Sequence, residues 1–152
     1  MLERLVGPDI SIEMRAQSEV PEVIVDIEQL ERVMLNLIMN AVDAIAGRGT
    51  IVIDAGTTNL DGRAAGAANI GPGTFVVISV TDTGSGMGPD VLAHLFEPFF
   101  TTKPPGQGTG LGLATVFGIV RQAGGTVDVE SAPQRGTTFR ILLPVAGSSS
   151  GE

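Results

Sequence analysis

The run EQLERVMLNLIMNAVDAIA, residues 28–46, is the stretch that decides the fold of the chain. Its apolar residues recur at spacings of three and four, which is the period of an amphipathic helix. Asn36 and Asn40 are one turn apart and Asp43 follows three residues later, so all three side chains project from one side of that helix. Asparagine forms helices less readily than the Lys and Glu that usually cover a solvated face. The two amides are therefore either a ligand-binding pair or ordinary surface residues, and the helix alone does not distinguish the two.

Composition limits the chain to one globular domain without disulfides. It has 152 residues, of which 43% are hydrophobic, enough to bury a core of helices on a sheet. A net charge of −8 and the absence of Trp and Tyr argue against a nucleic-acid-binding protein. The chain has no cysteine, which excludes thiolate metal sites. Neither a signal peptide nor a run of about 18 apolar residues is present, so we expect a cytoplasmic domain without membrane contact.

Short apolar runs on both sides of the helix predict a sheet. Residues 10–15 alternate apolar and polar side chains, as half-buried strands do, and residues 74–81 are mostly β-branched. Asp26 stands where it would cap the long helix, and Gly47 follows the end of that helix. Further strands are expected at residues 21–26, 50–55, 126–131 and 137–143, further helices at 89–95 and 111–123, and an irregular loop or hairpin at 57–73.

The order of these elements has no regular alternation of strand, helix and strand. It predicts an α/β (α+β) two-layer sandwich, in which a mixed, mostly antiparallel sheet of about five strands carries three helices on one face. Residues 1–146 would form this single domain and residues 147–152, GSSSGE, a flexible tail. Residues 96–110 contain three prolines and three glycines without a regular period. We therefore expect a long functional loop there, a lid over the site.

The sequence DTGSGMG, residues 82–88, follows directly on the strongest strand candidate. A carboxylate at Asp82 would accept a hydrogen bond from a ligand amine. The glycines at 84, 86 and 88 would let the backbone approach that ligand closely. The pattern predicts a binding site for a small ligand at the end of this strand.

A second glycine cluster, at positions 106, 108, 110 and 112, leads into the predicted helix at 111–123. Exposed N–H groups at a helix start bind phosphate, and Lys103 on the lid would add a positive charge for the same groups. The spacing differs from the dinucleotide motif GxGxxG, and neither a P-loop nor the HRD motif of protein kinases is present. Each glycine cluster alone also fits an ordinary turn, so the order of the motifs carries the argument.

Five motifs occur in an order that is known from one family. They are NLIMNAVDAI at 36–45, DTGSGMG at 82–88, FEPFFTTK at 96–103, GTGLGLATVFGIV at 108–120 and GTTFRILLP at 136–144. This series resembles the catalytic ATP-binding domain of bacterial sensor histidine kinases, which has the Bergerat (GHKL) fold shared with gyrase, mismatch-repair ATPases and a chaperone ATPase. It is similar above all to hybrid kinases, including the cell-cycle kinases of alphaproteobacteria. The resemblance covers residues 5–144 and implies the fold class predicted above.

The resemblance implies a role for each residue that matches a family motif. Asn40 would bind the Mg²⁺ that bridges the ATP phosphates with support from Asn36, and these two with Lys103 would form the catalytic set. Asp82 would accept the adenine amine, and Thr137 would join it through its hydroxyl. The other residues expected to contact ATP or ADP are Asp43, Gly84, Gly86, Phe99, Thr101, Thr102, Gly108, Thr109, Gly110, Leu111 and Gly112, while Phe96 and Phe100 would help to anchor the lid.

One departure from the wider superfamily bears on the reaction. Its ATP-hydrolysing members carry glutamate as general base at the position of Asn36, and an amide cannot take up a proton at neutral pH. The resemblance therefore implies a kinase that donates the γ-phosphate of ATP to a histidine on a separate dimerisation domain of a homodimeric protein, upstream of a response regulator. The only histidine, His94, is expected to be a surface or packing residue. The isolated chain should bind ATP without phosphorylating itself.

Two other functions compete with this one. A serine kinase of the anti-sigma-factor type, or an ATP-binding regulatory module, would have the same fold, but the long PFFTTK lid favours the histidine-kinase branch. The sequence DTGS at Asp82 is also the signature of aspartic proteases, which would need a dimer to pair two carboxylates. That interpretation leaves the Asn pair, the lid and the second glycine cluster unexplained.

Overall fold

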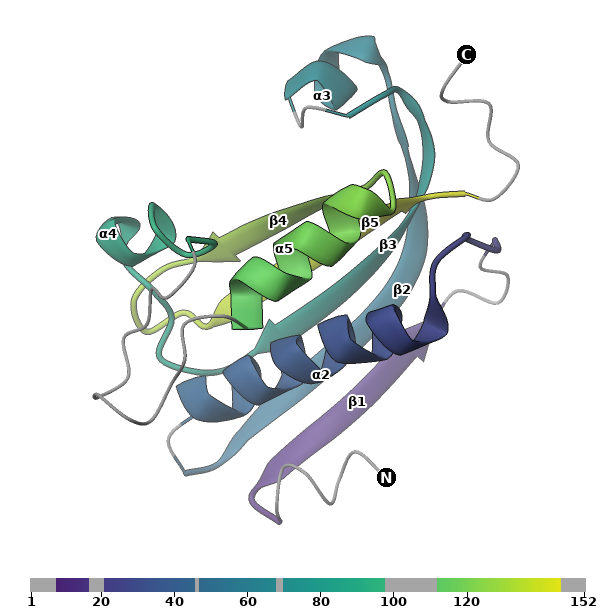
Figure 1. The fold of residues 1–152 in the computed structure, drawn as a ribbon. Coiled ribbons are helices and arrows are strands. Elements are labelled where there is room, and N and C mark those ends of the chain that lie inside the picture. Colours follow the sequence, from purple (N-terminus) through teal and green to yellow (C-terminus); the bar gives the residue numbers. More distant parts are fainter. Residues whose placement is uncertain (1–7, 17–20, 46, 68–69, 98–111, 146–152) are drawn as a thin grey trace.

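The computed structural model describes residues 8–16, 21–45, 47–67, 70–97 and 112–145 (Figure 1). The predicted tail and the predicted lid from residue 98 onwards lie outside these ranges. In chain order the elements are β1 (Ile10–Ala16), α2 (Ile27–Ala44), β2 (Gly49–Leu60), α3 (Gly62–Ala67), β3 (Gly73–Asp82), α4 (Pro89–Leu92), α5 (Gly112–Gln122), β4 (Thr126–Ser131) and β5 (Thr137–Pro144).

Helix α2 begins at a capping residue. The Asp26 carboxylate accepts a hydrogen bond from the N–H of Glu28 at 2.9 Å, which satisfies one of the unpaired donors of the first turn. The helix ends at Ala44, two residues before the predicted end, because the backbone of Ile45 is already extended. Its buried side chains recur at helical spacing and are Val33, Leu37, Ile38 and Ala41.

The strands form one mixed sheet in the order β1-β2-β3-β5-β4. Strands β1 and β2 are parallel and are connected through α2. The remaining neighbours are antiparallel. Helices α2 and α5 lie side by side over the same face of the sheet and contact each other (Figure 1). The predicted two-layer sandwich with a mixed, mostly antiparallel sheet of five strands is confirmed.

The hydrophobic core lies between the sheet and this helix layer. Val116 and Val120 of α5 pack there with the buried face of α2. The sheet contributes inward-facing side chains such as Ile51, Val80 and Ile141. Residues of α4 and the turn after it pack against the same cluster. The helices predicted at 28–46, 89–95 and 111–123 correspond to α2, α4 and α5, but α4 ends at Leu92 and the residues up to Leu95 form turns.

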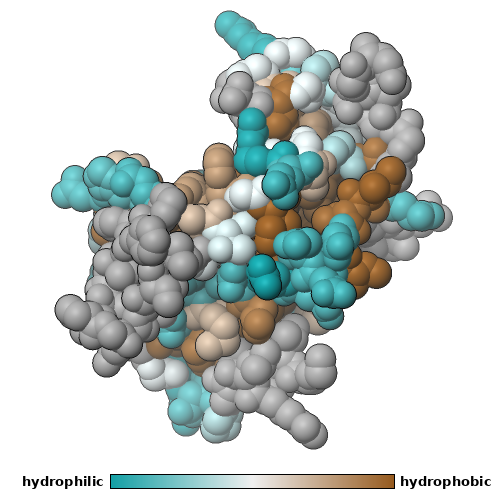
Figure 2. All heavy atoms as spheres, viewed as in Figure 1, coloured by the Kyte–Doolittle hydropathy of each residue, from teal (hydrophilic) through white to brown (hydrophobic). Residues whose placement is uncertain are grey.

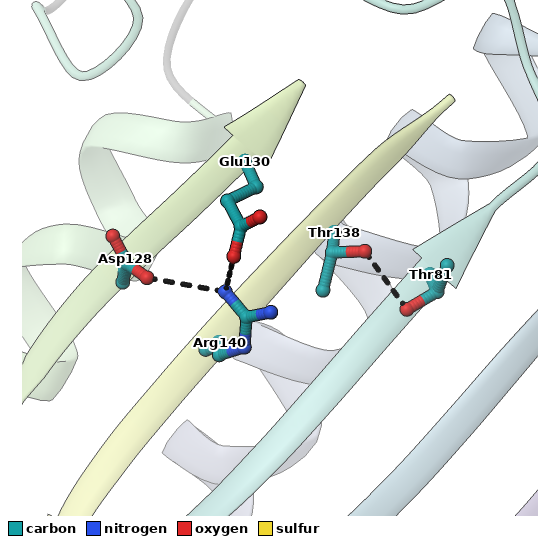
Figure 3. Close-up of polar contacts among 5 residues, drawn as sticks. All are labelled: Thr81, Asp128, Glu130, Thr138 and Arg140. Carbon is teal, nitrogen blue, oxygen red and sulfur yellow. Dashed lines mark hydrogen bonds and ion pairs between the residues drawn. The ribbon is translucent and has the colours of Figure 1, made fainter. Parts of the chain in front are cut away.

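The opposite face of the sheet carries polar side chains on β3, β4 and β5. Arg140 on β5 forms ion pairs with Asp128 at 3.2 Å and Glu130 at 2.6 Å, both on β4, and the hydroxyls of Thr81 and Thr138 lie 3.1 Å apart (Figure 3). These residues alternate along their strands with core residues, so the period of two places them on the face without helices. The alternation of the sequence therefore separates a packed face from a solvated one.

Two regions differ from the sequence prediction. Strand β2 continues to Leu60, because its residues keep antiparallel partners on β3 as far as the pair of Leu60 with Gly73. Of the two alternatives predicted at 57–73, a loop or an irregular hairpin, the structure shows the hairpin, since residues 57–60 pair with β3. Its connection contains the short helix α3, whose Gly- and Ala-rich sequence shows no amphipathic period. The strand predicted at residues 21–26 is wrong, since only an isolated bridge between Val23 and Val145 forms.

Some large apolar side chains are exposed on this domain, among them Ile24 and Ile27 next to the start of α2. On the helix-bearing face, hydrophobic and hydrophilic residues are interspersed (Figure 2). Within the described ranges, no helix combines the length and the apolar character that crossing a membrane requires.

Candidate functional site

Asp82 is the last residue of β3 and lies opposite Thr137, the first residue of β5. Both side chains are buried, with 6% and 4% of their surface exposed. The Asp82 carboxylate accepts a hydrogen bond from the N–H of Gly84 at 2.8 Å. Burial raises the pKa of Asp82 above its ordinary value, and the backbone N–H groups of Gly84 and Thr137 partly oppose that rise. A buried carboxylate held by backbone donors is an acceptor with a fixed position.

The glycine loop after Asp82 is held on its first side by the end of α2. The N–H of Ser85 donates to the Ala44 carbonyl at 3.0 Å. A Cβ at Gly84 would lie 2.6 Å from the same carbonyl oxygen, so this position has no room for a side chain. The close backbone approach at Gly84 is one to α2, whereas the predicted approach to a ligand stays a prediction.

The glycine loop is held on its second side by the turn at residues 132–136. The N–H of Gln134 donates to the Ser85 carbonyl at 2.6 Å. Gly86 has a φ of 72°, and a Cβ there would overlap the Ala132 carbonyl oxygen. The loop is thus clamped between α2 and the β4–β5 turn, which makes the surroundings of Asp82 rigid.

A short series of hydroxyl contacts links the loop to Thr137. The Ser131 hydroxyl lies 2.8 Å from the Thr137 hydroxyl and 3.0 Å from the Gly136 carbonyl oxygen. The N–H of Met87 donates to Ser131 Oγ at 2.8 Å. Polar contacts therefore connect β3, β4, β5 and the glycine loop at the Asp82 end of the site.

The two amides of α2 lie in different surroundings. Asn36 Nδ2 donates to the carbonyl of Gly112, the first residue of α5, at 3.1 Å. Asn40 Nδ2 is buried and has no hydrogen-bond partner among the described residues. Asp43, in the last turn, is exposed. A buried N–H donor without a partner is costly in a folded protein, so Asn40 Nδ2 fits an acceptor atom such as an oxygen of a ligand.

The surroundings of Asn40 fit a Mg²⁺ ion that is held mainly by a ligand. Among the described residues, no group of three or more His, Cys, Asp or Glu side chains is placed to bind a metal ion by itself. Mg²⁺ prefers oxygen ligands and is commonly held by one or two protein groups together with phosphates and water. One amide oxygen at Asn40 is compatible with such a site.

Part of the predicted site lies outside the described residues. This part comprises the predicted contacts of the lid and the phosphate loop, namely Phe99, Phe100, Thr101, Thr102, Lys103, Gly108, Thr109, Gly110 and Leu111. Of the flanking residues, Phe96 stacks on Phe117 of α5, with the ring centroids 5.3 Å apart. His94 is exposed and its Nδ1 lies 2.7 Å from the Glu97 carboxylate.

Ser131 and Met87 belong to the site but do not follow from the sequence. Serine at a strand end is a common residue, and the Met87 contact uses only the backbone N–H. Strand register is the feature that links Ser131 to the site, because Ser131 lies opposite Thr137, which in turn lies opposite Asp82. That register becomes readable only once the sheet order is known.

The fold and the site define a class of protein: an α/β sandwich that holds a buried acceptor carboxylate on its sheet and an unpaired amide on the adjacent helix. The chain belongs to the family described as histidine kinase-, DNA gyrase B-, and HSP90-like ATPase, whose profile matches residues 25–147. The histidine-kinase-type catalytic domain expected from the motifs is confirmed, and the aspartic protease alternative is excluded.

Similar proteins of known role are sensor kinases. The chain is 44% identical over 149 residues to the sensor kinase CckA of Brucella abortus, covering 95% of this chain and 15% of that protein. It is 41% identical over 137 residues to the sensor histidine kinase ZraS of Escherichia coli, covering 90% of this chain and 26% of that protein. CckA is an alphaproteobacterial kinase, and the motifs of this chain predicted a resemblance to kinases of that group. The chain thus spans roughly a seventh to a quarter of the length of these relatives.

Solved structures of histidine kinases share the fold. The mycobacterial sensor histidine kinase MprB matches with a TM-score of 0.72 and 29% identity, over 95% of this chain and 87% of that chain. Full-length ShkA in complex with AMPPNP matches with a TM-score of 0.70 and 32% identity, over 90% of this chain and 26% of that chain.

Proposed function

We propose that this domain binds Mg-ATP and donates the γ-phosphate to a histidine on a separate dimerisation domain of the same kinase, which then passes it to a response regulator. The observation that carries the proposal is the buried Asp82 carboxylate, fixed beside Thr137 at the end of β3 in a chain of this family. A response regulator as partner also makes the cytoplasm the expected compartment, and nucleic acid and membrane lipid are not expected partners.

The base of the nucleotide would be recognised at Asp82. An ionised carboxylate only accepts hydrogen bonds, so it selects a ligand edge that carries an N–H donor, such as the exocyclic amine of adenine. Gly84 and Gly86 let the loop pack closely against Ala44 and Ala132, which holds the backbone beside this carboxylate in place. Because the loop is clamped on both sides, little conformational freedom is lost when the base binds.

The phosphates would lie towards α2 and the start of α5. Asn40 would offer its amide oxygen Oδ1 to Mg²⁺, and the Asn36 contact with Gly112 holds α2 against the first turn of α5. Mg²⁺, when bound, would supply positive charge that offsets the negative charge developing during transfer. Lys103 and the glycines at 108 and 110 are proposed to contact the same phosphates.

Asn36 makes transfer to another protein more favourable than hydrolysis. Its Nδ2 donates to Gly112, and a neutral amide cannot remove a proton from water. Transfer requires an imidazole nitrogen in line with the γ-phosphorus, so that a P–N bond forms while the bond to the ADP oxygen breaks. His94 is paired with Glu97 and its neighbour Leu95 is buried in the core, so this segment would have to leave its place to reach the phosphate.

Isothermal titration calorimetry tests the binding half of the proposal. We expect saturable binding of ATP and ADP in the presence of Mg²⁺. Asp82→Ala should weaken it by about 1–3 kcal/mol, because the amine loses its buried partner. The matched control is Asp128→Ala, which removes an exposed carboxylate from the open face. Asn40→Ala should weaken ATP binding in Mg²⁺ but change binding in EDTA little. No heat with either nucleotide, or equal affinity of Asp82→Ala and parent, would refute this assignment.

Radioactive transfer tests the catalytic half. With γ-labelled ATP and Mg²⁺, the isolated chain should acquire no acid-labile, base-stable label. Label should appear on the histidine-bearing hairpin domain of a similar kinase, such as CckA of Brucella abortus, when that domain is added. Label on a serine of an added anti-sigma antagonist would favour the serine-kinase alternative instead. Strong label on the isolated chain that is lost in His94→Gln would overturn the separate-domain mechanism.

A further inference from the structure

Ser131 is the last residue of β4 and lies where β4, β5 and the glycine loop after Asp82 come together. It lies opposite Thr137 in the β4–β5 register, and Thr137 lies opposite Asp82 in the β3–β5 register. The side chain is partly buried and its hydroxyl makes contacts on three sides. None of the roles considered so far uses this residue.

The three contacts of the Ser131 hydroxyl leave one consistent arrangement of protons. The Gly136 carbonyl oxygen, 3.0 Å away, can only accept, so it takes the single Ser131 proton. The N–H of Met87, 2.8 Å away, can only donate, so it occupies one lone pair of Ser131 Oγ. The second lone pair then receives the Thr137 hydroxyl, 2.8 Å away, as a donor.

This arrangement determines what Thr137 can offer to a ligand. Its only hydroxyl proton points to Ser131, so both lone pairs of Thr137 Oγ1 are left as acceptors. Beside it, the Asp82 carboxylate is an acceptor as well. The side chains of Asp82 and Thr137 therefore present acceptors only, and a bound base or its ordered water must supply the donors to them.

We propose that Ser131 is a positioning residue that fixes the direction of the Thr137 hydrogen bond and thereby sharpens the preference of the site for an amine-bearing base over a carbonyl-bearing one. The proposal rests on adenine-nucleotide binding at Asp82. Inosine triphosphate differs from ATP at two atoms of this edge, because its base has a carbonyl oxygen in place of the exocyclic amine and an N–H donor at N1, where adenine has an acceptor. The comparison concerns the first difference, the group that replaces the amine facing Asp82 and Thr137. That oxygen would face acceptors without a donor, which is the arrangement that binding sites reject most strongly.

The test compares ATP with inosine triphosphate. Dissociation constants of both nucleotides with Mg²⁺ are measured at pH 8 by calorimetry for the parent and for Ser131→Ala. In Ser131→Ala the Thr137 proton is released and can turn towards the base, so inosine triphosphate should lose its disadvantage in part. We expect ATP to bind more weakly and the preference for ATP to fall by roughly five- to tenfold.

Two further variants separate this role from a loosened loop. Ser131→Thr keeps the hydroxyl and should restore the parent preference. In a Thr137→Val background, Ser131→Ala should cause no further change in preference, because the hydroxyl that it controls is gone. A purely structural role of Ser131 would weaken both nucleotides equally and leave the ratio unchanged, which would overturn the proposal.

Two outcomes need separate interpretations. If Ser131→Ala does not fold by circular dichroism, Ser131→Cys replaces it, since a thiol keeps the shape but forms much weaker hydrogen bonds. An unchanged preference in Ser131→Cys would then refute the proposal. If the parent binds neither nucleotide, the proposed ATP function fails, whereas tight ATP binding with an unchanged ratio in every Ser131 variant refutes only the role of Ser131.

Discussion

The glycines near the two ends of strand β3 differ in the space around their Cβ positions. At the end beyond Asp82, side chains at Gly84, Gly86 or Gly136 would run into backbone atoms of α2, of the 132–136 turn or of β3 itself. At the other end, near α3, a Cβ at Gly62 or Gly66 would meet no atom within 4 Å. Figure 1 shows α3 at the far end of the β2–β3 pair from the point where β3 ends at Asp82.

This difference distinguishes a preorganised binding site from a segment that only connects two strands. Where three backbone segments pack without side chains between them, a carboxylate such as Asp82 is held in one position before any ligand arrives. Where glycine has open space around it, the residue only connects one strand to the next. Substitutions at the two ends should therefore have effects of different size and sign.

Gly86→Ala should produce the largest effect. Alanine there would need a φ near 72° and would overlap the Ala132 carbonyl oxygen, so the loop or the turn has to move. We expect the free energy of unfolding to fall by about 3 kcal/mol or more, measured by urea denaturation. Nucleotide affinity should fall in parallel. A loss below about 1 kcal/mol would show that the clamp around the loop is not rigid.

Asp82→Asn should change stability and binding in opposite directions. Because burial raises the folded-state pKa of Asp82 above 3.8, its favourable contribution to folding is present at low pH and is lost as the pH rises through that folded value. Asparagine carries no charge to bury, so the nucleotide-free variant should melt a few degrees above the parent at pH 7 and lose this advantage towards pH 3.

The binding arm of this prediction uses the same variant. The introduced asparagine would present an amide N–H where a carboxylate oxygen stood, so ATP affinity should fall at least tenfold even though the fold is more stable. Thermal unfolding monitored by circular dichroism at several pH values, with and without Mg-ATP, measures both effects. A lower melting temperature of the variant at pH 7 would contradict the assigned cost of burying the charge.

Gly66→Ala probes the other end of the hairpin. The residue lies in α3, has no positive φ, and has open space at its Cβ position. Alanine loses less backbone entropy than glycine in a helix, so we expect a gain of about 0.5–1 kcal/mol in urea denaturation and unchanged ATP affinity. Gly118→Ala in α5, where the Cβ position is also open, is the matched control in a second helix. A loss of stability at both positions would contradict the comparison.

Arg140→Ala should have the smallest effect. Its ion pairs with Asp128 and Glu130 lie on the open face, where both carboxylate side chains are well over half exposed. Solvent and salt screen such pairs, so we expect a loss of about 0.5 kcal/mol that shrinks further in roughly 0.5 M salt. ATP affinity should not change. A loss as large as that of Gly86→Ala would mean that the open face, and not only the site end, controls the sheet.

The sequence predicted most of what depends on periodicity and on short motifs. Periodicity predicted the helix from residue 28 and the strands at 74–81, 126–131 and 137–143, because a period of 3.6 or 2 is visible in neighbouring residues. The order of the short motifs predicted the family. Local signals did not decide between a loop and an irregular hairpin at residues 57–60. These residues are held as a strand by partners on β3 that lie some fifteen residues further along the chain.

Within the candidate site, the sequence determines the chemistry of each side chain and the tertiary structure determines its contacts. That Asp82 accepts hydrogen bonds and that Asn36 cannot serve as a general base follow from side-chain chemistry, which the sequence by itself determines. Only the folded sheet decided that Ser131 meets Thr137 and that Asn36 donates to Gly112 while Asn40 is left unpaired among the described residues. The reason is that these contacts join residues from different elements, and the register and packing that bring them together arise from the whole core and not from any single stretch of the chain.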